Sequence, residues 1–138
     1  MCSEDNNFCE VFPIKRVSDA RGWFVKPICG KEPGLSNLQG EFYLVMAEPG
    51  EIRGNHYHEV ATEWFSVVQG CAELHLQDMA TGKRSVVNLS AENPQSIVVK
   101  PDIAHAFLSP SGVREQMILT AFSNQIFDPS DTIPFKVI

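Results

Sequence analysis

The chain has 138 residues and a formal net charge of −6. Its lysines and arginines form no cluster that would offer a surface for nucleic acid, and no apolar run approaches the length of a membrane span. The length suits one domain whose core needs no disulfide support. We therefore expect a single-domain protein with neither nucleic-acid nor membrane partners.

The four cysteines do not indicate a disulfide framework or a cysteine metal site. They are Cys2, Cys9, Cys29 and Cys71, and no two of them form a CxxC pair. Residues 1–7 are polar and contain no apolar signal segment, so we expect them to be frayed. The expected setting is a reducing compartment, the cytoplasm.

Short apolar segments run through the rest of the chain. Nine glycines and nine prolines interrupt them, which is typical of many short strands rather than of long helices. The spacing predicts an all-β domain, a sandwich or barrel, over residues 8–138, with a turn at 17–22 and a loop at 30–37. In chain order, the predicted strands are Phe8–Lys15, Trp23–Cys29, Glu41–Ala47, Glu51–His58, Glu63–Gln69, Cys71–Gln77, Arg84–Leu89, Gln95–Lys100, His105–Ser109 and Arg114–Phe122.

The last segment, Gln125–Ile138, is unusually apolar for a chain end. It carries Phe127, Ile133, Phe135 and Val137 in addition to the final isoleucine. So much apolar surface is costly to leave in water. We expect this tail to dock on its own barrel or on a partner subunit.

Two histidines and a glutamate form the most informative pattern in the chain. His56 and His58 are two residues apart in a predicted strand, and Glu63 follows five residues after His58. Side chains alternate along a strand, so both imidazoles should point to the same face. A turn over residues 60–62 would return Glu63 beside them, and two imidazoles with a carboxylate suit a divalent transition metal.

A fourth ligand would come from one of the two remaining histidines. His75 alternates with Leu74 and Leu76, which are predicted to face the core, so its ring should face solvent. His105 shares a strand face with Phe107 and is the better candidate. Solvated imidazoles at a strand end would explain a single histidine, but four donors at matched spacing favour a metal.

The same pattern resembles the two motifs of the cupin superfamily. The first motif reads His56-x-His58, four residues, Glu63, six residues and a glycine, and the second contains Pro101 and His105. The resemblance implies a double-stranded β-helix, a small jelly-roll barrel with its site in the mouth. The implied metal ligands are His56, His58, Glu63 and His105.

Three segments resemble particular cupins that act on nucleotide-linked sugars. Residues 19–24, DARGWF, resemble the opening of the dTDP-4-dehydrorhamnose 3,5-epimerases, and RGNHYH at 53–58 resembles both these and the 4-keto-6-deoxyhexose ketoisomerases. The following TE and the tail at 124–129, NQIFDP, are similar to the C-terminal cupin domain of bifunctional capsular-polysaccharide reductases. That resemblance extends over nearly the whole chain from Val17.

The resemblance implies an epimerase or ketoisomerase acting on a nucleotide-linked 4-keto-6-deoxy sugar in surface-polysaccharide biosynthesis. The implied substrate-binding residues are Arg21, Phe24, Tyr43 and Arg53, of which the two arginines could pair with a diphosphate through their planar guanidinium groups. The implied cofactor is a divalent metal, zinc, with iron, manganese or nickel as other candidates. The implied assembly is a homodimer. Lys26 stands where an acidic residue is usual, Asp102 where a glycine is usual, and no tyrosine follows Tyr57.

Alternatives remain at this stage. In a metal-free enzyme, His56 or His58 would act as the catalytic base that removes a proton next to the ketone. The protein could also be a cupin that binds a metal or a small ligand without turnover, or an iron-dependent oxygenase with open coordination positions.

Overall fold

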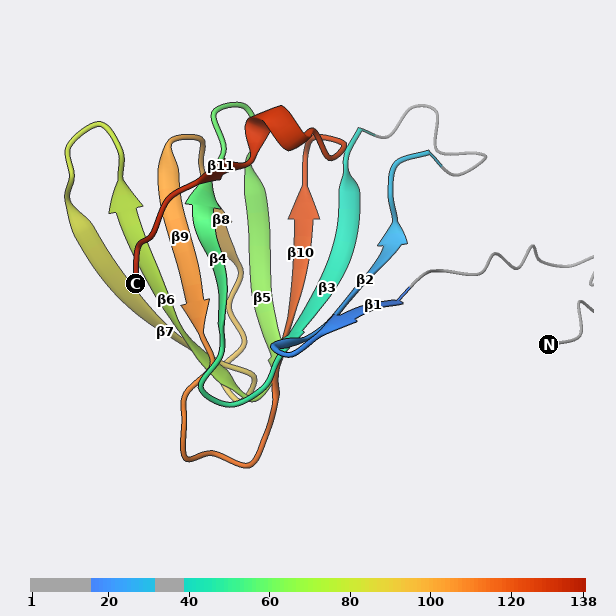
Figure 1. Cartoon of the computed structure of the whole chain (residues 1–138), viewed down its shortest axis with the longest axis vertical. Coiled ribbons are helices and arrows are strands. Elements are labelled where there is room, and N and C mark those ends of the chain that lie inside the picture. Colours follow the sequence, from blue (N-terminus) through green and yellow to red (C-terminus); the bar gives the residue numbers. More distant parts are fainter. Residues whose placement is uncertain (1–15, 32–38) are drawn as a thin grey trace, which may run out of the picture.

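The computed structural model describes residues 16–31 and 39–138, which fold into two antiparallel β-sheets that face each other (Figure 1). The predicted strand Phe8–Lys15 and residues 1–7, for which fraying was predicted, lie outside the described residues. The strands are β1 Arg16–Asp19, β2 Gly22–Ile28, β3 Glu41–Ala47, β4 Ile52–Tyr57, β5 Glu63–Gln69, β6 Cys71–Asp78, β7 Arg84–Ser90, β8 Ile97–Val99, β9 Ile103–Leu108, β10 Met117–Ser123 and β11 Ile133–Pro134. The one helical element in these ranges is a 3₁₀ turn, η1, at Pro129–Asp131.

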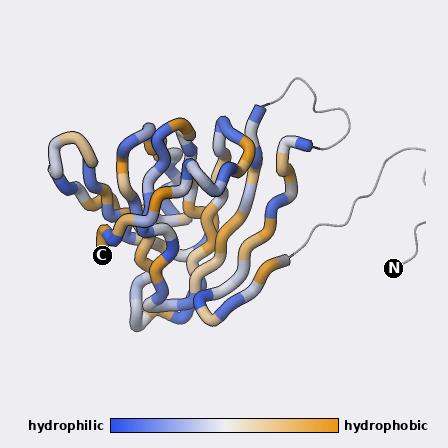
Figure 2. The backbone as a smooth tube through the Cα atoms, turned by 45° about the horizontal axis from the view of Figure 1, so that its top comes forward, coloured by the Kyte–Doolittle hydropathy of each residue, from blue (hydrophilic) through white to orange (hydrophobic). Residues whose placement is uncertain are grey.

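One sheet has six strands in the order β1-β2-β3-β10-β5-β8, and the other has five in the order β11-β4-β9-β6-β7. Apolar residues recur along the strands (Figure 2), and the buried ones from both sheets form the main core cluster. The largest fully buried apolar side chains are Leu74 on β6 and Met117 and Leu119 on β10. The all-β prediction is therefore confirmed, and the core lies between the two sheets.

The hairpin at the start of the described chain differs from the sequence prediction. Residues 16–19 form strand β1, and the turn predicted over 17–22 is reduced to Ala20 and Arg21. Asp19 pairs directly with Gly22 across this two-residue turn. The carboxylate of Asp19 accepts the backbone N–H of Arg21 at 2.8 Å, which lets the chain reverse in so short a turn.

The C-terminal tail packs on the outer face of the five-stranded sheet. Strand β11 pairs with β4, and Val137, 4% exposed, packs against Ala104 and Ala106 of β9. The core covers one face of β9 and the tail covers the other, which explains why four successive residues of this strand, 104–107, are buried. Among the described residues, no helix is long and apolar enough to cross a membrane.

Candidate metal centre

Three strands bring His56, His58, Glu63 and His105 together at one end of the barrel. His56 lies near the end of β4, His58 directly follows that strand, Glu63 begins β5 and His105 lies on β9. One ligand atom from each residue lies within 4.8 Å of the others. Glu63 is 3% exposed and His105 is 1% exposed, so the centre is shielded on its inner side.

A β-bulge in β4 sets the position of the first histidine. The pairing of β4 with β9 shifts between Gly54 and His56, and His56 then lies directly opposite His105. Gly54 has φ +111° and Asn55 has φ +59°, values that few side chains accept. A Cβ atom on Gly54 would lie 2.8 Å from the carbonyl oxygen of His105, so glycine is needed where the two strands approach.

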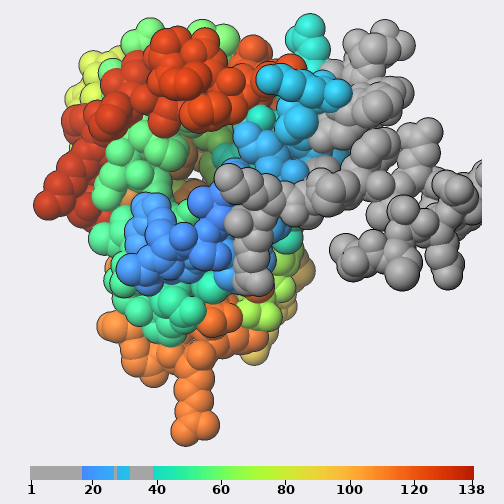
Figure 3. Space-filling model, turned by 45° about the vertical axis from the view of Figure 1, so that its right-hand side comes forward, coloured from blue at the N-terminus to red at the C-terminus, as the bar shows by residue number. Residues whose placement is uncertain are grey.

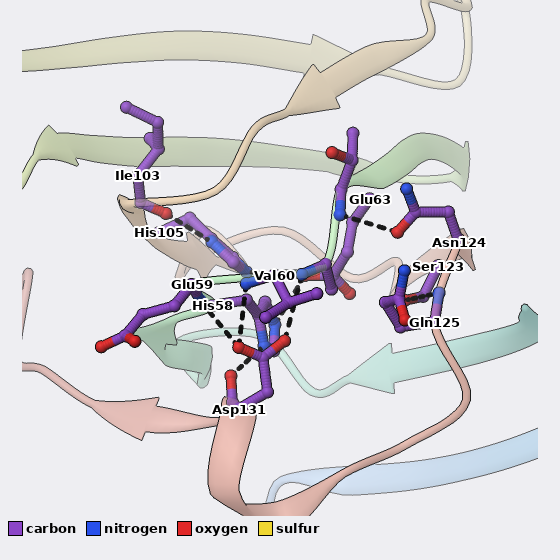
Figure 4. Close-up of polar contacts among 12 residues, drawn as sticks. His58, Glu59, Val60, Glu63, Ile103, His105, Ser123, Asn124, Gln125 and Asp131 are labelled. Carbon is purple, nitrogen blue, oxygen red and sulfur yellow. Dashed lines mark hydrogen bonds and ion pairs between the residues drawn. The ribbon is translucent and has the colours of Figure 1, made fainter.

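Backbone carbonyls fix the tautomers of two of the histidines (Figure 4). Nδ1 of His58 lies 2.7 Å from the carbonyl oxygen of Asp131, and Nδ1 of His105 lies 3.2 Å from that of Ile103. A carbonyl oxygen only accepts hydrogen bonds, so Nδ1 must carry the proton in both rings. Each Nε2 atom then carries a lone pair that points into the centre. Metal-binding histidines are usually oriented in this way by a hydrogen bond at the other ring nitrogen.

The Nε2 lone pairs of His58 and His105 are placed to coordinate a cation beside Glu63. Nε2 of His58 lies 2.8 Å from Oε1 of Glu63, and Nε2 of His105 lies 3.5 Å from the same oxygen. Despite this closeness, Nε2 of His58 and Oε1 of Glu63 are buried atoms without a hydrogen-bond partner in the described part of the chain. Two buried acceptors stay this close only when a proton or a metal ion lies between them. Because four donor groups converge here, the residues fit a divalent metal.

The protonation states of the cluster also suit metal binding, which needs neutral imidazoles and an ionised carboxylate. Burial, reinforced by the neighbouring histidines, lowers the pKa of His56 from 6.5 to about 4, and burial lowers the pKa of His105. Burial opposes ionisation of Glu63, but its contact with His58 and its electrostatic interaction with His105 outweigh burial and lower its pKa. Burial also opposes charging of His58, yet Glu63 and the carbonyl of Asp131 raise its pKa, so this is the ring that a proton would occupy when no metal is bound.

The centre forms the floor of a pocket in the mouth of the barrel. Figure 3 shows the hollow between the tail, the β4 segment and the β1–β2 hairpin. Of the residues predicted to bind substrate, Phe24, Tyr43 and Arg53 line this pocket together with all four candidate ligands. The hydroxyl of Tyr43 donates to Oε2 of Glu63, whereas His58 contacts the other carboxylate oxygen, Oε1. Burial and the charge of Glu63 raise the pKa of Tyr43 well above 10, so this phenol keeps its proton.

Arg21 differs from the other predicted substrate-binding residues. Its side chain is exposed and binds Asp19 through two nitrogens, at 2.6 and 3.1 Å, and it is not among the residues that line the pocket. Arg53 does line the pocket, and its guanidinium donates to the carbonyl oxygen of Met46 at 3.1 Å. Arg53 is therefore the arginine that the structure brings to the site.

Sequence reasoning missed two polar groups at the pocket. Nζ of Lys26 pairs at 2.9 Å with Glu41, whose side chain is almost fully buried, and lies 5.3 Å from the ring centre of Phe127. Asp131 contacts the loop that joins the candidate ligands His58 and Glu63. Lys26 was noted in the sequence only as a departure from a family pattern, and no local pattern distinguished Asp131.

A family model described as the polysaccharide biosynthesis C-terminal domain matches residues 17–133. The chain belongs to this family. A curated relative of the domain is the UDP-2-acetamido-2,6-beta-L-arabino-hexul-4-ose reductase of Pseudomonas aeruginosa, which is 28% identical over 117 residues. The match covers 85% of this chain but 29% of the reductase, so the chain spans less than a third of that relative's length.

Solved structures identify the fold of this polysaccharide biosynthesis domain. The capsular polysaccharide assembling protein CapF of Staphylococcus aureus superposes with a TM-score of 0.79 at 23% identity, over 92% of this chain and 33% of CapF. An oxalate decarboxylase of Bacillus subtilis superposes with a TM-score of 0.69 at 17% identity, over 88% of this chain and 30% of the decarboxylase. The cupin fold expected from the sequence is thus confirmed.

Proposed function

We propose that this domain is a metal-binding cupin that acts in the cytoplasm as an epimerase or ketoisomerase on a nucleotide-linked 4-keto-6-deoxy sugar in surface-polysaccharide biosynthesis. The observation that carries the proposal is the convergence of three imidazoles and a carboxylate at the floor of a pocket that Arg53 and Lys26 also line. The family and the Pseudomonas relative, whose name specifies a UDP-linked 4-ketose, support this class of substrate.

We propose zinc as the metal. Three imidazole nitrogens and one carboxylate oxygen are ligands that zinc accepts in catalytic sites, and the same set also suits iron, manganese and nickel. An oxalate decarboxylase that shares the fold contains Mn(II) centres, so manganese is the first competitor to test. Metal analysis of protein purified without added metal distinguishes these ions.

The reaction class is removal of a proton next to a ketone, followed by return of the proton to another face or carbon. A divalent ion in this centre would act as a Lewis acid toward the ketone oxygen. Arg53 would bind the diphosphate through its planar guanidinium, and the apolar wall formed by Phe24 and Phe65 would limit access of water to the sugar. Water would take up the proton that is removed from the sugar. Tyr43, which keeps its proton beside Glu63, would donate that proton to the enolate, and the resulting phenolate would recover a proton from water.

The main competing mechanism needs no metal. His56 or His58 would then be the base, and the close contact between His58 and Glu63 would be a shared proton. Alanine variants of His56 and Glu63 separate the two mechanisms, because only the metal-binding mechanism predicts that the bound metal is lost in both variants. A binding protein without turnover, or an iron-dependent oxygenase, would retain the metal but leave the sugar unchanged.

We also propose that the domain forms a homodimer. Five apolar side chains lie in one row across the outer face of the six-stranded sheet, in the order Val98, Trp64, Phe122, Phe42 and Ile28. Four of them are between 36% and 49% exposed. The row contains no charged residue, so a second copy would cover it without burying an unpaired charge, whereas a charged partner surface would.

The test of the function is solvent exchange. The purified protein is incubated in deuterated water with UDP- and dTDP-linked 4-keto-6-deoxy sugars, and the carbons next to the ketone are examined for deuterium. We expect deuterium there with the wild type and with His75→Gln, a histidine that pairs with Glu73 away from the pocket. Glu63→Gln should abolish exchange, and the absence of exchange on every sugar with the wild type would refute an enzyme of this class.

A further inference from the structure

The C-terminal tail lies against the loop that joins two of the candidate ligands. Residues 59–62 connect His58 to Glu63, and the 3₁₀ turn η1 ends beside this loop at Asp131 (Figure 4). Asp131 lies more than 65 residues further along the chain than either ligand. Asp131 also lines the pocket above the centre. The tail therefore forms part of the pocket wall in addition to contacting the loop.

Asp131 accepts one hydrogen bond from each of four successive residues. Its carbonyl oxygen accepts from Nδ1 of His58 at 2.7 Å. One carboxylate oxygen accepts the N–H groups of Glu59 and Val60 at 2.8 and 3.0 Å, and the other accepts the N–H of Ala61 at 3.0 Å. Three successive backbone N–H groups around one carboxylate form a cradle for an anion, and here the tail supplies that anion.

These four bonds determine two properties of the centre. The bond to the carbonyl keeps the proton on Nδ1 of His58, so that its Nε2 lone pair points toward Glu63. The bonds to the carboxylate hold the loop whose shape sets the distance between His58 and Glu63. Without them, three N–H groups of the loop would lose their partner, and the loop would have other conformations available.

We propose that Asp131 is a positioning residue for the metal centre, and that docking of the tail and binding of the metal are therefore coupled. This inference rests on the proposed metal centre, but it adds a residue that the ligand motif does not contain. Asp131 contacts no metal-ligand atom that faces the centre, so it acts through His58 and the loop. By linkage, a metal that requires the ordered loop also stabilises the docked tail.

The rest of the tail has a separate attachment, which makes the proposal testable in folded protein. The side-chain oxygen of Asn55 accepts the N–H groups of Val137 and Ile138, at 2.8 and 3.3 Å. Val137 is also buried against β9. Loss of the Asp131 carboxylate should therefore release the loop while leaving the end of the tail in place.

The test compares metal affinity in Asp131→Asn, Asp131→Ala and the matched control Asp128→Asn. Asp128 is an exposed aspartate that caps the same turn and also lines the pocket; its side chain bonds to Ser130, and asparagine keeps the accepting oxygen. Residues that orient metal ligands typically contribute about 10- to 100-fold in affinity. We expect a loss of that size in Asp131→Ala, a smaller loss in Asp131→Asn, which keeps one acceptor, and a change of less than about twofold in Asp128→Asn.

A spectroscopic measurement distinguishes positioning from general stability. The protein loaded with Co²⁺ should show an altered visible absorption spectrum in both Asp131 variants and an unchanged spectrum in Asp128→Asn. In the wild type, metal should slow amide exchange at residues 59–61 and in the tail, but not at residues 85–88, the part of β7 that contains no buried residue.

The possible outcomes test the positioning role, the coupling and the metal centre separately. Wild-type affinity and spectrum in both Asp131 variants would overturn the positioning role and leave the metal centre intact. Exchange at 59–61 that is unaffected by metal would overturn the coupling, even if the variants failed to fold. A wild-type protein that binds no metal would overturn both the centre and this inference.

Discussion

Glu63→Gln is the most direct test of the metal centre, because the two side chains have nearly the same shape. The substitution removes the negative charge of a residue that is 3% exposed and whose Oε1 lies within 3.5 Å of Nε2 in two histidines. The amide still offers one oxygen, so the contact with Tyr43 is retained. The substitution should therefore reduce metal affinity without creating a cavity in the core.

The size of the effect follows from the number of ligands. Apparent binding free energies for four-ligand zinc sites are about 10–16 kcal/mol, or roughly 2.5–4 kcal/mol for each ligand when shared equally. At about 1.4 kcal/mol for each factor of ten, loss of the carboxylate should weaken binding by roughly 60- to 700-fold. Non-additivity among the ligands broadens this range but does not change its direction.

The assay is competition between the apoprotein and a chromophoric chelator of known affinity. The matched control is Glu73→Gln, a glutamate on β6 that pairs with His75 at 3.1 Å and lies outside the pocket lining. We expect the control to bind metal as the wild type does. Equal affinity in Glu63→Gln and Glu73→Gln would show that Glu63 is not a ligand, and the proposed centre would be wrong.

Three further outcomes are expected. The metal-free protein should lose stability as the pH falls from 6.5 toward about 4, because burial lowers the pKa of His56 and the unfolded chain binds more protons there; thermal unfolding of His56→Gln should show a shallower dependence, and an equal slope would contradict this. Gly54→Ala should lower the unfolding midpoint in urea by more than Gly82→Ala, since both glycines have positive φ but only the first would meet backbone within 3 Å. Phe122→Lys should convert a dimer to a monomer in light scattering, and an unchanged mass would exclude this face.

The sequence predicted the strands well where one face of the sheet is buried. The limits of β3 and β5 match the prediction: β5 alternates buried and less buried residues, and β3 is a continuous apolar run between clear turn signals. Strand β1 was missed because its four residues are polar or exposed and form a strand only by pairing with β2. Pairing of this kind has no signature in the local sequence.

The candidate site could be predicted from spacing, but its support could not. Three of its four residues lie within eight positions, and the fourth was chosen by eliminating His75, which does lie outside the pocket. Asp131 and Asn55 contact segments more than 70 residues away in the chain. A contact between segments so far apart in the chain produces no periodic pattern in the sequence. The roles of these two residues could therefore be identified only from the folded structure.

A β-bulge, rather than strand alternation alone, sets the position of the histidine pair. On a regular strand His56 and His58 would share a face by alternation, but β4 ends at Tyr57 and its pairing shifts between Gly54 and His56. The left-handed backbone at Asn55 places His56 opposite His105, and the same residue binds the end of the tail through its side chain. The residue whose backbone conformation directs the first candidate ligand thus also anchors the segment that carries Asp131. A substitution at Asn55 that requires ordinary φ should therefore disturb both His56 and the tail, which makes this position a structural link between the candidate metal centre and the C-terminus.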